Sequence, residues 1–103
     1  MADLTQTQWN DQLTEDDNAV ILDVRTMAEL REGYIPNMMH LDIYNPGAFM
    51  DGARELDASK SYYIYCRSGA RSGQACAILN SLGIEKTYNL VGGILEWKGK
   101  TTI

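Results

Sequence analysis

Two short segments of this chain are apolar on both faces, and they limit the possible folds more than any other feature of the sequence. Residues 19–24 read AVILDV and are β-branched or apolar up to Asp23, and residues 62–65 read YYIY. Such runs are typical of strands that are covered on both sides, as in a parallel sheet. Parallel strands need crossover connections, which are usually helices. The sequence therefore predicts an α/β fold.

Helix signals precede, separate and follow these strands. Thr5 with Gln8, and Thr26 with Glu29, have the spacing of capping boxes. They predict a helix that runs to about residue 13 and a short one that ends before residue 33. The other expected elements are strands at 39–43 and 87–91 and helices at 48–56, 71–82 and 93–98. This order predicts a parallel sheet with helices on both faces.

The length of the chain allows one domain. Globular domains cluster near ~100 to 150 residues, so we expect a single domain over residues 1–103. The longest apolar runs have about five residues, far fewer than the roughly 20 that cross a bilayer. The first 12 residues lack a basic region followed by an apolar stretch, so no secretory signal is expected. A cytoplasmic location is the default expectation.

The charge of the chain is acidic overall but unevenly distributed. Nine basic and 14 acidic residues give a net charge of −5, which disfavours nucleic acid and anionic membranes as partners. Residues 62–83, however, include Arg67 and Arg71 and no acidic side chain. An anionic ligand is therefore expected to bind in this segment.

The two cysteines have different surroundings. Cys66 and Cys76 are ten residues apart, a spacing that matches neither a zinc site nor a dithiol redox motif, and free thiols are the simpler interpretation. Cys76 lies beside the apolar stripe of the helix expected at 71–82, where a cysteine usually serves packing. Cys66 directly follows the strand YYIY, at the end where open parallel sheets bind their ligands.

The loop CRSGARS, residues 66–72, carries the predicted chemistry. Its small side chains allow backbone N–H groups to point inward at the start of a helix, which forms a cradle for an anion. A thiol at the centre of this cradle should have a lowered pKa, and the thiolate is the nucleophilic form. We therefore predict Cys66 as the catalytic residue. The predicted substrate and anion site comprises Arg67, Ser68, Gly69, Ala70, Arg71 and Ser72, and no metal ligand is predicted.

The same loop resembles the active-site loop of rhodanese-like sulfurtransferases. The resemblance spans about residues 4–99 and depends on an ordered set of signatures. Asp23, Val24 and Arg25 with Glu29 resemble the first signature, Gly33, Tyr34, Ile35 and Pro36 the glycine-histidine-isoleucine-proline turn, and Gly92, Gly93 and Trp97 the closing glycine pair and tryptophan. Tyr34 replaces the usual histidine, and Asn37 and Met38 replace a small pair. Asp23 and Arg25 are expected to be structural, with Arg25 reaching Glu29 or a loop carbonyl, and their place at the carboxyl end of a strand leaves a site-lining role open.

The resemblance implies a fold and an activity. The fold would be three-layered, with a five-stranded, mostly parallel sheet between helices. The activity would be the transfer of sulfane sulfur from thiosulfate or another persulfide donor through a persulfide on Cys66. The expected partners are a small anionic sulfur donor and a thiol, cyanide or protein acceptor, and the chemistry needs no metal or organic cofactor.

Two other functions fit the same loop. One is a sulfur carrier or interaction module that a protein partner loads. The other is a phosphatase or an arsenate reductase, whose loops place five residues between the cysteine and an anion-binding arginine. Here only four residues separate Cys66 from Arg71, and the next position is Ser72. The shorter loop favours sulfur over phosphorus.

Overall fold

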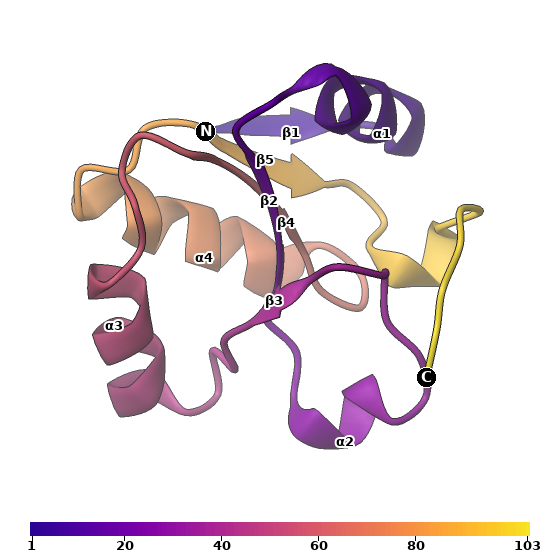
Figure 1. The fold of residues 1–103 in the computed structure, drawn as a ribbon. Coiled ribbons are helices and arrows are strands. Elements are labelled where there is room, and N and C mark those ends of the chain that lie inside the picture. The colour runs from indigo at the N-terminus through magenta and orange to yellow at the C-terminus, as the bar shows by residue number, and fades with distance from the viewer.

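The five strands of the computed structural model, which describes residues 1–103, form one sheet (Figure 1). The elements are β1 (Ala2–Leu4), α1 (Gln6–Glu15), β2 (Ala19–Asp23), α2 (Met27–Leu30), β3 (Met39–His40), α3 (Pro46–Arg54), β4 (Ser61–Tyr65), α4 (Ala70–Ser81), β5 (Thr87–Leu90) and the 3-10 helix η1 (Ile94–Glu96). The strand order is β1-β5-β4-β2-β3, and every pair is parallel. The predicted fold class is confirmed.

The central strand β4 separates two apolar cores. Tyr62 and Ile64 belong to a core that includes α3 and α4, whereas Tyr63 and Tyr65 pack with Trp9 of α1. This alternation follows from the two-residue period of a strand, and all five residues of β4 are buried. Figure 1 shows α3 and α4 together on one side of the sheet and α1 on the other. The apolar run at residues 62–65 is thus covered on both faces.

Both predicted capping boxes are present. The Thr5 side chain accepts a hydrogen bond from the Gln8 N–H, and the Gln8 side chain accepts one from Thr5 N–H, at the start of α1. Thr26 and Glu29 make the same exchange at the start of α2. These local bonds satisfy N–H groups that a helix end leaves free, so the sequence alone could locate both starts.

Two strands differ from the sequence prediction. No strand was predicted at β1, which is three residues long and pairs with β5, far away in the sequence. The strand predicted at 39–43 is regular only at Met39–His40. Leu41 and Ile43 still donate backbone hydrogen bonds to the β2 side of the sheet, but a turn in which Asp42 accepts the Tyr44 N–H ends the ladder. The predicted closing helix is the short η1.

The longest helix, α4, has 12 residues, and no helix combines the length and the apolar character that spanning a bilayer would require.

Candidate active site

Cys66 lies at the carboxyl end of β4, where the chain turns into α4. Gly69, with a φ of 112°, is the N-cap of α4, and its N–H donates to the Cys66 Sγ at 3.0 Å. The left-handed backbone at Gly69 suits a residue without a Cβ. The Ser72 hydroxyl lies 3.3 Å from the same sulfur, and Cys66 is 1% exposed. The loop therefore surrounds the sulfur with donors at the N-terminus of a helix.

These donors change the acidity of the thiol. Burial acts to raise the pKa of Cys66, but hydrogen bonds from the Ser72 hydroxyl and from the backbone of Ser72, Gly69 and Ser68 outweigh it. The net effect is a pKa below the ordinary cysteine value. Donors that point at a sulfur stabilise its charged form, so the loop favours the thiolate.

Replacing Ser72 with alanine should raise the pKa of the Cys66 thiol, because the thiolate loses a donor while its burial stays. At a pH below the titration midpoint, alkylation by iodoacetamide should slow by about two- to tenfold. The midpoint of the rate against pH should move upward. Ser68→Ala is the matched control, since only the backbone of Ser68 acts on the sulfur. An equal shift in both variants would contradict this role of Ser72.

Cys76 has the opposite environment. It lies in the core between the sheet and α4, is 0% exposed and forms no disulfide. Burial raises the pKa of its thiol to about 11. A thiol with this pKa stays protonated at neutral pH, so the two cysteines differ in reactivity.

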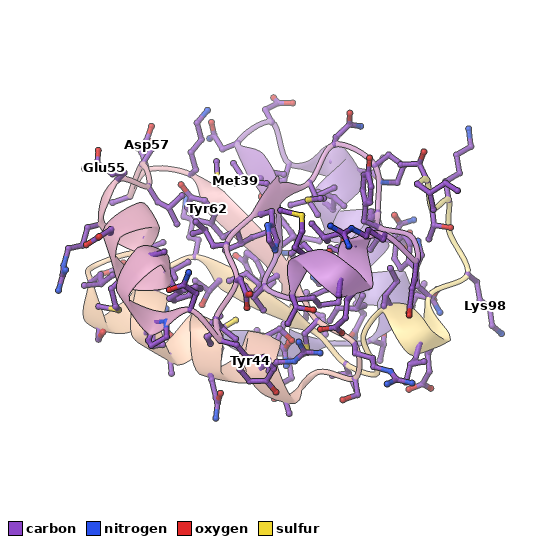
Figure 2. All side chains as sticks on the ribbon, turned by 90° about the horizontal axis from the view of Figure 1, so that it is seen from below. Met39, Tyr44, Glu55, Asp57, Tyr62 and Lys98 are labelled. Carbon is purple, nitrogen blue, oxygen red and sulfur yellow. The ribbon has the colours of Figure 1, made fainter.

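Arg71 pairs with a side chain that sequence analysis did not assign to it. Its guanidinium donates to both carboxylate oxygens of Glu29, at 2.6 and 2.8 Å, and lies over the Tyr44 ring at 5.0 Å. Tyr44 is at the surface of the molecule near α4 (Figure 2). The hydrogen bonds from Arg71 lower the pKa of Glu29 to about 2, and Glu29 raises that of Arg71. The anion-binding role of Arg71 stays a prediction.

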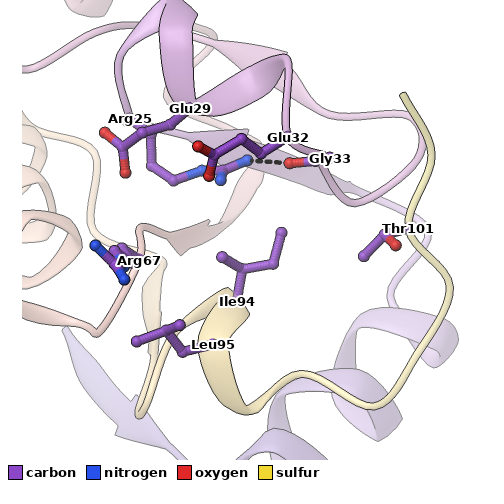
Figure 3. A pocket seen from close by; sticks show the side chains of 8 residues that line it. All are labelled: Arg25, Glu29, Glu32, Gly33, Arg67, Ile94, Leu95 and Thr101. Carbon is purple, nitrogen blue, oxygen red and sulfur yellow. Dashed lines mark hydrogen bonds between the residues drawn. The ribbon is translucent and has the colours of Figure 1, made fainter.

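Arg67 is exposed and forms no ion pair in the structure. It lines a hollow of about 400 Å³ beside the cysteine loop (Figure 3). The other lining residues are Arg25, Glu29, Glu32, Gly33, Ile94, Leu95 and Thr101. Figure 3 shows Ile94 on η1 pointing toward Glu32, and Leu95 on the side of Arg67. Arg67 is therefore the loop arginine whose charge is free to meet a ligand.

Arg25 is structural, as the sequence indicated, and one of its two expected partners is correct. It donates to the Asp23 carboxylate at 2.8 Å and to the Gly33 carbonyl at 2.8 Å. Both side chains of the ion pair are buried. Glu29, the other expected partner, pairs with Arg71 instead. The Asp23–Arg25 pair thus ties the end of β2 to the turn after α2.

Asn89 is a neighbour of the site that sequence analysis missed. Its Oδ1 lies 2.5 Å from the Ser72 hydroxyl, and its Nδ2 donates to the Gly69 carbonyl and to Asp3. Ser72 has one hydroxyl proton, and Asn89 Oδ1, the Gly69 carbonyl and the Cys66 sulfur compete for it. One feature of the sequence could have indicated this neighbour: Asn89 places an amide in the segment TYNLV, near the carboxyl end of β5.

The residues that follow the closing glycine pair, Gly92 and Gly93, are hydrogen-bonded to the start of the cysteine loop. The N–H groups of Ile94 and Leu95 donate to the carbonyls of Cys66 and Arg67, at 3.0 and 3.1 Å. Gly93 has a φ of 59°, and a Cβ there would collide with the Arg67 backbone and approach the Cys66 oxygen to 2.6 Å. Only glycine permits this close approach, which explains its place in the sequence.

Comparisons with known proteins show the family of the chain. The sequence profile of the rhodanese-like domain matches residues 6–100. The chain belongs to the rhodanese-like family. A sulfurtransferase of Allochromatium vinosum is 39% identical to this rhodanese-like domain, and the match covers 82% of this chain and 77% of the relative. A thiosulfate sulfurtransferase of Pseudomonas syringae is 31% identical over 84% of this chain and 79% of its own.

Solved structures show the same fold. The crystal structure of a rhodanese-like domain protein from Staphylococcus aureus superposes with a TM-score of 0.84 at 30% identity, covering 100% of this chain and 98% of that one. The family predicted from the ordered signatures is therefore confirmed. Sulfur transfer, in general terms, is the chemistry that the relatives support for this rhodanese-like domain.

Proposed function

We propose that this rhodanese-like domain moves sulfane sulfur from a small donor to a thiophilic acceptor through a persulfide on Cys66. The observation that carries the proposal is the pair of donors on the Cys66 Sγ, the Gly69 N–H and the Ser72 hydroxyl, at the start of α4. They favour the thiolate, which is the form that attacks sulfur. Arg67 and Arg71 are the proposed contacts to an anionic donor, as predicted, and Ala70 contributes only backbone.

The first half-reaction loads the enzyme. The Cys66 thiolate attacks the outer sulfur of the donor, a new S–S bond forms, and the bond between the two donor sulfurs breaks. With thiosulfate, the electron pair of the broken bond leaves on sulfite. Cys66 then carries a persulfide anion, so the total charge is unchanged. The loop donors from Arg67 to Ser72 stabilise this anion as an oxyanion hole does.

The second half-reaction unloads the enzyme. A thiolate, cyanide or a protein thiol attacks the outer sulfur of the persulfide, and the Cys66 thiolate leaves. The donor product departs before the acceptor reacts, so the kinetics should be ping-pong. Because the acceptor takes up the transferred sulfur and the thiolate is regenerated, the cycle needs no net electron transfer.

Intact-mass spectrometry tests the proposal. Incubation of the wild-type protein with thiosulfate, or with the persulfide of a small thiol, should add one sulfur, about 32 Da, and cyanide should remove it. An unchanged mass with both donors would refute the proposed function.

The sulfur-carrier alternative uses the same cysteine and differs in kinetics. It gains support from the Arg71–Glu29 pair, which leaves Arg67 as the unpaired loop arginine and so weakens the case for tight binding of a small anion. Rapid loading from a protein persulfide, together with a high Michaelis constant for thiosulfate, would favour the carrier.

The phosphatase alternative is disfavoured by the short loop. Hydrolysis of an aryl phosphate that depends on Cys66 would favour it instead.

A further inference from the structure

Both arms of the Arg71 guanidinium already have a partner. Nη1 and Nη2 each donate to a separate oxygen of Glu29, and the Tyr44 ring covers one face of the group. The two side chains of the pair are 14% and 23% exposed, so water screens their attraction only in part. A donor that used Arg71 would have to displace this carboxylate or share the arginine with it.

Glu29 is itself held in place. Its Oε1 accepts from the Thr26 N–H at 3.2 Å and from the Thr26 hydroxyl at 3.1 Å, as part of the capping box of α2. With a pKa near 2, its carboxylate stays ionised at neutral pH. Moving Glu29 away from Arg71 would therefore break the helix cap as well as the ion pair. The carboxylate is a fixed negative charge beside the loop.

The charges around the hollow nearly cancel. Arg25 is paired with buried Asp23, and Glu29 with Arg71. The lining charges without an ion-pair partner are those of Arg67 and Glu32, which have opposite signs. Among the unpaired groups, a dianion such as thiosulfate would find one guanidinium, that of Arg67, and one carboxylate, that of Glu32. A donor that carries its own positive group would fit this balance better.

We propose that Glu29 is a specificity-determining residue, which occupies Arg71 and so disfavours dianionic donors relative to small-thiol persulfides of lower charge. This inference rests on the proposed function, because it names the donor class of the same cysteine. For a persulfide RS–SH, the Cys66 thiolate attacks the outer sulfur, the donor S–S bond breaks, and RS⁻ leaves. The outer sulfur and its hydrogen pass to Cys66, so atoms and electrons balance.

The variant Glu29→Gln tests the proposal. Glutamine also serves in a capping box, so α2 keeps its start while the charge on Arg71 is no longer neutralised. The value of kcat/KM for thiosulfate should rise about tenfold, a change that corresponds to one charge-assisted contact. For the persulfide of cysteamine, which has an ammonium group and no carboxylate, kcat/KM should stay within about twofold. If Glu29 had a purely structural role, the substitution would change kcat/KM for both donors by a similar factor.

Two further variants isolate the mechanism. Glu32→Gln removes the same charge from the same hollow but leaves Arg71 paired, so it should change kcat/KM for thiosulfate much less. Adding Arg71→Ala to Glu29→Gln should abolish the gain. An equal gain in Glu32→Gln, or a gain that persists without Arg71, would overturn the proposal, as would no gain in Glu29→Gln.

Wild-type protein provides a measurement that needs no variant. Its kcat/KM should be higher for cysteamine persulfide than for thiosulfate, and the reverse preference would overturn the proposal even if Glu29→Gln failed to fold. Failure of the proposed function looks different, since neither donor would then add sulfur to Cys66. Loading by both donors with no effect of Glu29→Gln would reject the role of Glu29 alone.

Discussion

Replacing Cys66 with serine should abolish sulfur loading while leaving the fold intact. A serine hydroxyl titrates far above neutral pH and forms no persulfide, so the surrounding donors would have no sulfur anion to stabilise. The added mass of about 32 Da after incubation with thiosulfate or a persulfide should disappear, and turnover should fall to background. Serine is close to cysteine in size, so the unfolding transition should stay near that of the wild type.

Cys76→Ala is the matched control for this experiment. Cys76 is the other thiol, is fully buried, and has a pKa raised to about 11 by burial. Its removal should lower stability modestly but leave sulfur loading and the response to cyanide unchanged. If sulfur loading survived in Cys66→Ser and vanished in Cys76→Ala, Cys76 would be the reactive cysteine, and the assignment of Cys66 as the catalytic residue would be refuted.

Replacing Asp23 with alanine should be the most destabilising change to a charged residue near the site. Asp23 is 0% exposed and Arg25 only 4%, and four hydrogen bonds join the carboxylate to Arg25. Removing the carboxylate leaves the buried guanidinium with the Gly33 carbonyl as its one remaining hydrogen-bond acceptor and the Tyr65 ring 5.5 Å away. Breaking a buried pair in this way costs about 3–5 kcal/mol, a large part of the 5–15 kcal/mol that typically holds a small domain folded. Urea denaturation followed by circular dichroism measures the loss.

An exposed ion pair of the same residue types provides the control. Asp51 lies 4.0 Å from Arg54 on α3, and their side chains are 85% and 60% exposed. Asp51→Ala should therefore change the free energy of unfolding by less than about 0.5 kcal/mol. If Asp23→Ala cost as little as Asp51→Ala, burial would not be what makes the Asp23–Arg25 pair important.

Local signals explain why much of the fold could be predicted. The capping boxes at Thr5 and Thr26 act within one helical turn, and the apolar strands at residues 19–24 and 62–65 show their burial in their own composition. The edge strand β1 has no such signal, because three residues gain their structure only by pairing with β5. The strand predicted at 39–43 is regular only at Met39–His40, because the turn at Asp42 ends it.

The sequence by itself determined the family, the α/β fold and the position of Cys66 at the end of a strand and the start of a helix. The fold and the place of Cys66 follow from local patterns, namely an apolar strand, a loop of small side chains and the helical spacing of apolar residues, and the family follows from an ordered set of signatures along the chain. The tertiary structure decided which groups surround that loop. Glu29 is 42 positions from Arg71, and Asn89 is 17 from Ser72, yet each pair is in hydrogen-bond contact. Such contacts depend on how the elements pack against one another, and no spacing along the chain encodes them.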